Sequence, residues 1–560
     1  MARRDVLTRS KKRKAEQLLR QRQLPEARAA FERISRITPR DPEVWLNLGA
    51  VNGMMGFLDE AEAAFRQALV LRDDLAQAHF NLSYLLLSQG RLQAALPHLQ
   101  TYTRLMPGAF EGFAQLGRLH QDLGQLDEAR RAFERAAELN PGDVAVHNNL
   151  GIVLQDLGQF DAARASYRKA LSLNPRADDA YANLGNLCLQ QRAFDEAAEH
   201  YQKALTLNPR NAATHASVGH LHASLGQPET AVTCFDEAIR LQPDYPGAHW
   251  NRALALLALG RFKAGWEDYE WRFQCPEVVW QMGRRQLHKP QWDGGALAGK
   301  TVLVHAEQGF GDTLQFCRYL PMVAQQGGRV VFECPPELVT LMQGMSAIAQ
   351  LVEQGSEEAA GVAYDVHAPL MSLPRLFGTT LDSIPNVVPY LAPDKQLFER
   401  WRGRLNDHQG FKVGLVWSGN PDNWRDQQRS IALSDLAPLA AVAGVRFYSL
   451  QRGAAAQQAN QPPAGMGLTD LSAELNDFSD TAACIENLDL VISVDTAVAH
   501  LAGALGCPVW TLIYTPADWR WLLAREDSPW YPTMRLFRQQ APQQWRPVIE
   551  QLAQALRELV

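Results

Sequence analysis

Apolar side chains in the first half of the chain recur with helical spacing, and the whole pattern repeats every 34 residues. In most blocks a small residue and an aromatic residue return at the same positions, and a proline closes the block. The block that starts at residue 144 shows this with Leu150, Gly151, Ala163, Tyr167 and Pro175. Blocks begin at residues 42, 76, 110, 144, 178 and 212, with a partial block before them and a half block from His249. The pattern predicts six pairs of antiparallel helices between two incomplete ends.

The residue types explain the spacing. Gly and Ala fall where two helices touch and a larger side chain would hold them apart, aromatic rings fill the gaps, and proline stops the second helix. Each pair leaves an apolar face that the next pair covers, so the array stacks as a superhelix with a concave surface. These residues match the tetratricopeptide repeat (TPR), and the resemblance implies a protein-binding surface formed by residues 1–270.

One position of the repeat carries a residue type that helix packing does not explain. The sixth residue of the block, on the first helix of each pair, is Asn in five of seven places, although Asn lowers helix propensity. The five are Asn47, Asn81, Asn149, Asn183 and Asn251. One interpretation is a ladder of amides that hydrogen-bond to the backbone of an extended peptide. The other is that Asn simply recurs in repeats of this kind and bonds to the neighbouring unit.

After residue 270 the 34-residue period ends. A Trp-rich stretch (Trp266, Trp271, Trp280 and Trp292) accompanies a predicted junction at 271–297. From Thr301 onward, short apolar runs alternate with helical stretches, which predicts parallel sheets with helices on both faces. Two such sets predict two Rossmann-like lobes, at 298–400 and 401–560, with a cleft between them. The predicted strands are TVLVHA, RVVFEC, KVGLVWSG, VRFYSL, LDLVISV and CPVWTLI, and helices are predicted at 313–325, 434–443, 496–506 and 547–559.

Composition and charge narrow the functional classes. The 560 residues are 46% hydrophobic and 21% charged with a net charge of −6, so the chain is globular and lacks the basic field of a nucleic-acid binder. Seven cysteines form no CxxC motif and no run of 18 apolar residues occurs, which predicts a cytoplasmic protein without a transmembrane segment. His215, His220 and His222 lie close together, but 220 and 222 do not share a helix face, so no metal site is predicted.

The loop EQGFGDT at 307–313 lies between a predicted strand and a predicted helix. A dinucleotide fingerprint needs a third glycine where this chain has Leu314, so an NAD-type site is only weakly supported. Gly309 and Gly311 let the backbone come close to a ligand, and Asp312 places a carboxylate at the mouth of the helix. The alternative is that Asp312 is a plain N-cap.

The run LVISVDTAVAHLAGALG at 490–506 is the second candidate ligand loop. A buried strand ends before Asp495 and Thr496, and a helix of small residues follows. The start of a helix carries about half a positive charge, which suits a diphosphate. Asp495 would repel phosphate and suits the hydroxyl of a sugar or ribose. The alternative is that Asp495 or Thr496 only caps the helix.

The stretches EQGFGDTLQF and SVDTAVAHLAGALG resemble the two signatures of the heptosyltransferase-like glycosyltransferases of family 9. The resemblance covers about 298–540 and implies a two-lobed GT-B fold, a nucleotide-diphosphate sugar as donor substrate, and no cofactor or metal ion. Together with the repeats, the layout resembles the O-linked N-acetylglucosamine transferases. The resulting fold class is an α-helical TPR solenoid followed by an α/β GT-B domain.

The resemblance also implies roles for single residues. Asp312 matches the catalytic base of the family. The family element D-T-G-x-x-H holds the diphosphate and the sugar of the donor, and it corresponds here to Asp495, Thr496, Ala497 and His500. Ala497 stands where the family has glycine, so the backbone has less room to approach the donor.

A cationic phosphate contact of the family is expected within WSGNPDNWRDQQRS, after the first strand of the second lobe. Arg429 is the first choice for this contact and Arg425 the second. Ser418 and Asn420 follow the same strand and are further candidates to touch phosphate. Gly309 and Gly311 complete the expected donor site.

Three functions are compatible with these residues. The first is an inverting, metal-independent glycosyltransferase that modifies a hydroxyl of a protein or peptide lying along the repeats. The second keeps this chemistry but uses a glycan or a lipid-linked sugar as acceptor, with the repeats recruiting a partner. The third is an inactive scaffold that binds proteins through its repeats. The Trp-rich tail at 515–532 is predicted to pack between the lobes and is not counted as a site.

Overall fold

The computed structural model describes residues 2–276, 278, 287–406, 410–423 and 426–560. The chain divides into two compact units, Met1–Arg210 and Asn211–Val560. The boundaries predicted at 270, 297 and 400 stay predictions. Within the described residues, no helix combines the length and the apolar character that a membrane crossing requires.

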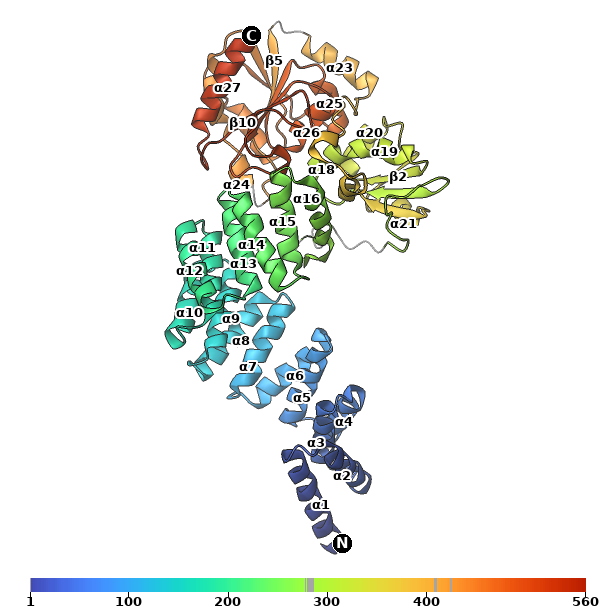
Figure 1. Ribbon diagram of the computed structural model, residues 1–560, viewed down its shortest axis with the longest axis vertical. Helices are drawn as coiled ribbons and strands as arrows, with labels where there is room; N and C mark the ends of the chain where they lie inside the picture. The colour runs from blue at the N-terminus through green and yellow to red at the C-terminus, as the bar shows by residue number, and fades with distance from the viewer. Residues whose placement is uncertain (1, 277, 279–286, 407–409, 424–425) are drawn as a thin grey trace. The chain divides into compact units, whose positions relative to one another are not determined.

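Unit 1 consists of antiparallel helix pairs that follow one another in chain order (Figure 1). The first helices of the complete pairs begin at residues 42, 76, 110, 144 and 178, as the 34-residue period predicts. The helices are α1 (Ala2–Arg20), α2 (Leu24–Ile37), α3 (Pro42–Met54), α4 (Leu58–Leu71), α5 (Ala76–Ser88), α6 (Leu92–Leu105), α7 (Phe110–Asp122), α8 (Leu126–Leu139), α9 (Val144–Asp156), α10 (Phe160–Leu173), α11 (Asp178–Gln190) and α12 (Phe194–Leu207).

The two helices of a pair touch as closely as the repeat pattern predicts. A Cβ atom on Gly151 of α9 would lie 2.5 Å from the ring of Tyr167 on α10, which is closer than atoms pack. Gly185 and Tyr201 form the same contact, also at 2.5 Å. Both rings are buried and fill the space that the glycines leave.

Unit 2 begins with two more helix pairs. They are α13 (Ala212–Ser224), α14 (Pro228–Leu241), α15 (Pro246–Ala258) and α16 (Phe262–Tyr269). The half block predicted from His249 is therefore a complete pair, whose second helix is short and continues as the 3-10 turn η1 (Glu270–Gln274). Trp266 and Tyr269 of α16 are buried in a core shared with the first sheet, so here the sheet takes the place of a further repeat.

The first sheet of unit 2 has four parallel strands in the order β3-β2-β1-β4. They are β1 (Thr301–His305), β2 (Arg329–Cys334), β3 (Gln350–Glu353) and β4 (Val366–Pro369). The chain returns from β3 to place β4 beside β1, so the strand order reverses between β1 and β4. The surrounding helices are α18 (Phe310–Phe316), η2 (Cys317–Tyr319), α19 (Leu320–Gln325), η3 (Pro336–Leu338), α20 (Val339–Met342), α21 (Glu357–Gly361), η4 (Leu370–Ser372), α22 (Leu373–Leu376) and η5 (Leu381–Ser383).

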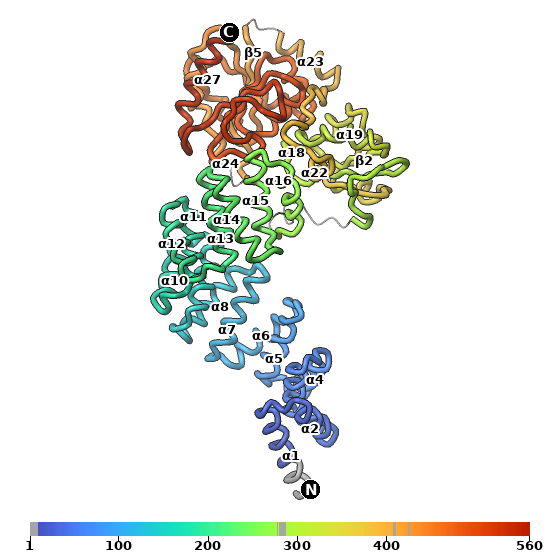
Figure 2. The backbone as a smooth tube through the Cα atoms, in the orientation of Figure 1, coloured from blue at the N-terminus to red at the C-terminus, as the bar shows by residue number. Residues whose placement is uncertain are grey.

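The second sheet has six parallel strands in the order β10-β9-β8-β5-β6-β7, and its order reverses between β5 and β8. Figure 2 draws this part of the chain, from β5 onward, in orange to red. The strands are β5 (Phe411–Val416), β6 (Val445–Ser449), β7 (Leu468–Asp470), β8 (Leu490–Val494), β9 (Val509–Ile513) and β10 (Met534–Arg538). Its helices are α23 (Lys395–Leu405), α24 (Asp426–Arg429), η6 (Leu433–Ala441), η7 (Ala454–Asn460), α25 (Phe478–Ile485), α26 (Ala497–Ala504), η8 (Trp519–Trp521) and α27 (Arg546–Leu559).

Two predicted helices differ from the structure. The helix predicted at 313–325 begins earlier, at Phe310, and a 3-10 turn at Cys317–Tyr319 divides it. Pro321 explains the division, because it has no N–H to donate to the carbonyl four residues before it. The helix predicted at 434–443 is the 3-10 segment η6, which contains Pro438. Strands β3, β4, β7 and β10 were not predicted, and the first three of them span only three or four residues each.

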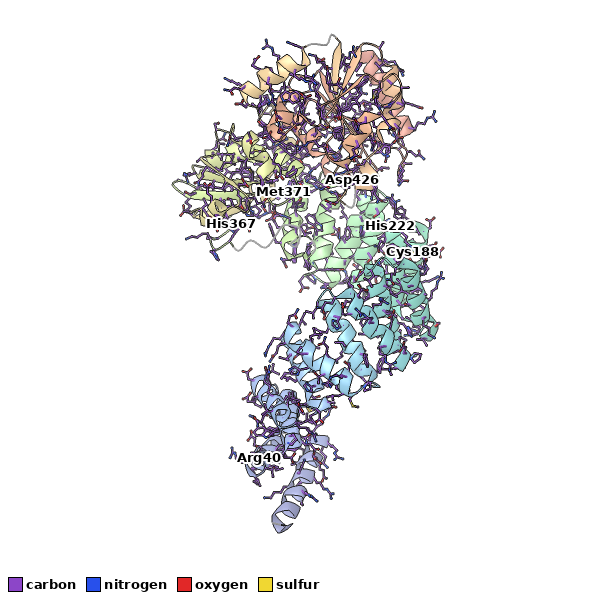
Figure 3. All side chains as sticks on the ribbon, turned by 180° about the vertical axis from the view of Figure 1, so that it is seen from behind. Arg40, Cys188, His222, His367, Met371 and Asp426 are labelled. Carbon is purple, nitrogen blue, oxygen red and sulfur yellow. The ribbon has the colours of Figure 1, made fainter. Side chains whose placement is uncertain are left out.

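A buried ion cluster joins the end of the repeats to the first sheet. Arg272 of η1 is fully buried, and its Nη2 donates to Glu307 Oε1 and to Ser372 Oγ at 2.8 Å each. Glu307 follows β1, and its Oε1 also accepts the backbone N–H of Met371, which follows β4, at 3.0 Å (Met371 is labelled in Figure 3). The cluster therefore fills the point where the strand order of this sheet reverses.

Candidate functional site

The reversal between β5 and β8 brings two loops together at the carboxyl ends of the strands, where open parallel sheets bind ligands. Trp417 and Ser418 follow β5, and Asp495 follows β8. Gln451 holds the first loop, because its Oε1 accepts the N–H of Trp417 at 3.0 Å and of Ser418 at 2.8 Å. Its Nε2 donates to the Ser418 carbonyl at 3.0 Å. Ser418 is therefore fixed at the switch point through its backbone.

Arg429 of α24 bridges these two loops. Its Nη1 donates to the backbone carbonyl of Asp495 at 3.0 Å, and its Nε donates to Asp426 Oδ1 at 3.0 Å (Asp426 is labelled in Figure 3). A Cβ atom on Gly419 would collide with both Arg429 and Asp426. Glycine at this position lets the β5 loop run directly against the charged side chains.

Thr496 holds the N-cap position of α26, but its side chain does not cap the helix. Its hydroxyl lies 2.9 Å from Ser493 Oγ instead. Ala497 and Val498 in the first turn are small and partly exposed. The start of α26 is thus formed by backbone N–H groups and small side chains, an arrangement that suits an anion.

Helix α18 packs against α26, so the two loops singled out in the sequence lie close together (Figure 1). A Cβ atom on Gly311 would lie 2.9 Å from Cδ2 of His500 and 3.8 Å from Cα of Ala497. Any larger residue at 311 would push the two helices apart. The close approach predicted for Gly311 therefore serves a helix of the same chain.

Asp312 uses its two carboxylate oxygens differently. Oδ2 accepts the backbone N–H of Gly309 at 3.0 Å, so the helix is capped from its third residue and Gly309 holds the N-cap position. Oδ1 forms an ion pair with Nη2 of Arg520, a residue 208 positions later in the chain. Capping accounts for one oxygen only, and the other faces a cation from another segment.

Arg520 is a site residue that sequence reasoning missed. It is buried on η8, within the Trp-rich tail, and it donates from Nε to Gln315 Oε1 and from Nη1 to Asp518 Oδ1, at 2.8 Å each. The predicted packing role of the tail is confirmed, since Trp519 and Trp530 are buried in the core that contains α18. The sequence feature that could have indicated Arg520 is the presence of an aspartate and an arginine inside the otherwise apolar stretch ADWRWLL.

His500 is buried beside this ion pair. Its Nδ1 lies 2.9 Å from Tyr531 Oη, and its ring stacks on Trp521 with centroids 5.3 Å apart. Burial, together with the charge of Arg520, lowers the pKa of His500 to about 3. The imidazole is therefore neutral near pH 7, and its Nε2 lies 4.0 Å from Asp495 Oδ1.

Burial raises the pKa of both acidic residues in the site. For Asp312, the charge of Arg520 offsets part of the rise. For Asp495, burial and the nearby carboxylate of Asp518 raise the pKa to about 6. The guanidiniums of Arg520 and Arg429 supply the positive charge near the carboxylates of Asp312, Asp495 and Asp518. Asp495 is ionised near pH 7 and takes up a proton in mildly acidic solution.

The five asparagines of the repeats are all partly exposed on the first helices of their pairs. Asn183 donates to Oδ1 of Asn148 in the preceding repeat at 3.0 Å, which favours the neighbour interpretation at this position. Asn81 and Asn251 form hydrogen bonds within their own helices. Four of the five belong to unit 1, and Asn251 belongs to unit 2. The peptide ladder stays a prediction.

The other predicted residues are placed as follows. Asn420 is exposed, and its Oδ1 accepts the backbone N–H of Asp422 at 3.1 Å within a turn. Arg425 and Trp280 lie outside the described residues. Across the part of the chain that the structure describes, no group of three His, Cys, Asp or Glu side chains is arranged to hold a metal ion.

Family models match both halves of the chain. Tetratricopeptide repeat models match residues 55–110 and 149–212, 111–176, and 219–260. The model of glycosyltransferase family 9 (heptosyltransferase) matches residues 443–544. The chain therefore carries TPR repeats followed by a C-terminal family 9 glycosyltransferase domain. The family 9 match includes Asp495 and Arg520, whereas Asp312 and Arg429 precede it.

The chain is also similar to individual proteins. It is 28% identical to Protein FlbA of Caulobacter vibrioides over 330 residues, which are 55% of this chain and 54% of FlbA. It is 31% identical to Protein O-mannosyl-transferase Tmtc3 of Drosophila melanogaster over 110 residues, 19% of this chain and 12% of that protein. Among solved structures, a tetratricopeptide repeat protein from Parabacteroides merdae is 19% identical, with 44% of this chain and 98% of that chain covered and a TM-score of 0.36. The chain thus spans about half of the length of FlbA and less of Tmtc3.

Proposed function

We propose that this chain is a glycosyltransferase of the GT-B type, which moves a sugar from a nucleotide-diphosphate donor to a hydroxyl of a protein or peptide held by the repeats. The observation that carries the proposal is the meeting of α18 with α26. In this contact Gly311, the neighbour of Asp312 in the first turn of α18, lies against Ala497 and His500 of the helix that follows β8, which supports a shared role for Asp312 and the start of α26. A proton acceptor and an anion-binding helix start are the two groups that such a transfer needs.

The donor half of the proposed site lies at the start of α26. Its backbone N–H groups and the guanidinium of Arg429 can stabilise the negative charge that grows on the leaving diphosphate. Asp495 faces the same region and can accept a hydrogen bond from a hydroxyl of the sugar or ribose. These side chains and amides supply the positive charge for which other transferases use a divalent ion, so the proposed reaction is metal-independent.

The proposed reaction is a single displacement. The acceptor oxygen bonds to the anomeric carbon while the bond from that carbon to the diphosphate oxygen breaks, and the diphosphate leaves with the electron pair. Asp312 takes the proton of the acceptor hydroxyl, a contribution typically worth about 10²- to 10⁴-fold in rate. Attack from the side opposite the leaving group inverts the anomeric configuration.

The first test incubates the full chain with a panel of sugar nucleotides, with and without EDTA, and measures thermal shift and release of the nucleoside diphosphate. We expect one donor to stabilise the protein and to release its diphosphate in EDTA as well. Stabilisation that is lost in EDTA would contradict metal independence. A panel that gives neither stabilisation nor release would overturn the proposal and leave a protein-binding scaffold.

A matched pair of variants separates catalysis from helix capping at Asp312. Asp435 is the third residue of η6 and accepts the backbone N–H of Ala432 at 3.0 Å, so it repeats the capping contact of Asp312 outside the site. We expect D312N to keep the donor-induced thermal shift and to lose release, and D435N to keep both. Equal release by D312N and the wild type would remove Asp312 from the role of base.

A further inference from the structure

Arg520 lies in the tail after β9 and pairs with Asp518 of its own segment, yet it also pairs with Asp312 in the first turn of α18. We infer that Arg520 is a positioning residue for Asp312, which fixes the orientation and the charge of the carboxylate. The inference rests on the proposed function for the role of Asp312. It extends that function, because it assigns a residue of the Trp-rich tail to the working of the site.

The orientation of Asp312 is determined from two sides. Gly309 N–H holds Oδ2 at 3.0 Å, and the guanidinium of Arg520 holds Oδ1. A carboxylate bound through both oxygens has little rotational freedom about its terminal torsion. Loss of the Gly309 contact would remove the cap of the helix, whereas loss of Arg520 leaves that cap in place. Arg520 is therefore the partner whose removal tests positioning without removing the cap.

Arg520 is itself held rigidly. Gln315 lies three residues after Asp312 on the same helix, and its Oε1 accepts from Nε of the guanidinium that pairs with Asp312. Asp518 accepts from Nη1, and Trp519 lies under the guanidinium with its centroid 4.4 Å away. The guanidinium thus binds two side chains of α18 and one of its own segment. Because these contacts fix the guanidinium, the guanidinium in turn holds the carboxylate of Asp312 in one position.

The charged and titratable groups around the ion pair of Asp312 and Arg520 come from three elements. The tail supplies Arg520 and Asp518, and the region of α26 supplies His500, which is neutral near pH 7, together with Asp495. Helix α16 supplies the neutral phenol of Tyr269. Burial raises the pKa of Asp312 and Asp518 adds to the rise, so Arg520 is the group in this set that favours the ionised carboxylate. A base must be ionised to take a proton.

The experiment uses the full chain and the variants R520Q, R520K and R525Q. Arg525 is the matched control, because it belongs to the same tail and pairs with Asp527 at 2.5 Å on the surface. The ionisation of Asp312 is followed by infrared difference spectra of 13C-aspartate-labelled protein, each background being compared with its D312N counterpart. We expect the midpoint for Asp312 to rise in R520Q by about one pH unit or more, since a nearby opposite charge lowers a carboxyl pKa by about 1–3 units. R520K should keep most of the wild-type midpoint, and R525Q all of it.

Release of the diphosphate gives the second readout, over about pH 5 to about pH 9. R520Q should lower kcat about tenfold or more, with a smaller effect on KM, and should shift the acidic limb upward together with the infrared midpoint. R520Q with the wild-type infrared midpoint would overturn the inference, whether or not the protein transfers sugar. If R520Q does not fold, R520K decides through kcat, because a wild-type kcat in R520K would show that the fork-shaped guanidinium positions nothing. A wild type that releases no diphosphate contradicts the proposed function alone, since the infrared midpoints still test Arg520.

Discussion

Arg429 links the two loops at the switch point of the second sheet through the carbonyl of Asp495, and it is the first choice of the sequence analysis for the phosphate contact. Because hydrogen bonds to charged groups contribute about 1.5–3 kcal/mol, we expect R429Q to bind the nucleoside diphosphate about 10- to 100-fold more weakly. Calorimetry with the diphosphate of the active donor measures this loss. R404Q is the control, because Arg404 pairs with Glu474 at 2.8 Å on the surface of the same half of unit 2. An unchanged Kd for R429Q would assign the phosphate contact to another group.

His500 makes the stability of unit 2 sensitive to acid. Its pKa is lowered to about 3 in the folded protein, whereas an unfolded chain binds this proton near its ordinary value of about 6.5. The unfolded state therefore binds more protons across that window, so the free energy of unfolding falls as the pH falls from about 6.5 to about 3. Asp495 acts in the opposite sense, because its raised pKa lets the folded state gain a proton as the pH falls below about 6.

Between about pH 7 and about pH 5, we expect the free energy of unfolding to fall by about 2 kcal/mol less in H500Q than in the wild type. Urea unfolding followed by tryptophan fluorescence measures this mainly for unit 2, since 13 of the 14 tryptophans lie after residue 210 and only Trp45 precedes it. H222Q, on a partly exposed histidine of α13, should keep the wild-type pH dependence. Equal pH dependence in H500Q and the wild type would contradict the assignment.

At the scale of single residues, the sequence identified candidate residues that lie within short motifs. Asp312, Asp495 and His500 were found from short motifs, and the structure brings them together. Arg520 could not be found in this way, because its partner Asp312 lies 208 positions away and no local pattern connects them. A buried arginine among tryptophans indicates an internal carboxylate, but it does not indicate which one.

At the scale of helices, the repeat depends on a contact that only glycine permits. In G185A the new methyl group would meet the ring of Tyr201 at 2.5 Å. Overpacking of this kind costs about 1–3 kcal/mol, which exceeds the gain of up to about 1 kcal/mol in helix propensity, so unit 1 should become less stable. G53A is the control, since its methyl group would meet only Ala61, at 3.9 Å. Thermal unfolding by circular dichroism should show a lower Tm for G185A only, and an unchanged Tm in G185A would contradict this account of the spacing.

Helices and strands were predictable where a strong period extends over many residues. The 34-residue period located the first helix of the six repeats that begin at 42, 76, 110, 144, 178 and 212, and β2 begins and ends where its apolar run does. The 3-10 segments at Cys317–Tyr319 and Leu433–Ala441 were not predicted, because apolar spacing does not register a proline that lacks an N–H. The buried Arg272 cluster also escaped prediction, since Glu307 was read only as part of a ligand loop.

At the scale of the whole molecule, the site depends on segments from separate parts of the chain. The family 9 match covers 443–544 and therefore lies within the second sheet region, while Asp312 lies in the first turn of α18, which follows β1. Two features bring the residues of the candidate site together. Helix α18 packs on α26, and the Trp-rich tail packs in the same core as α18. Sequence similarity thus reaches Asp495 and Arg520, whereas the place of Asp312 in the candidate site is argued from geometry.

The acceptor is tested by the five asparagines of the repeats. If their amides hold an extended peptide, replacing all five by Ala should leave release of the diphosphate from the donor unchanged and reduce transfer to a peptide, because donor chemistry depends on residues of the two sheets. The control replaces Asn140 and Asn174, whose side chains accept backbone N–H groups in loops at the ends of second helices, at 3.3 and 3.0 Å. Mass spectrometry of the peptide and a parallel diphosphate assay separate the two activities. Full peptide transfer by the fivefold variant would contradict the ladder, and it would favour an acceptor that reaches the site without the repeats.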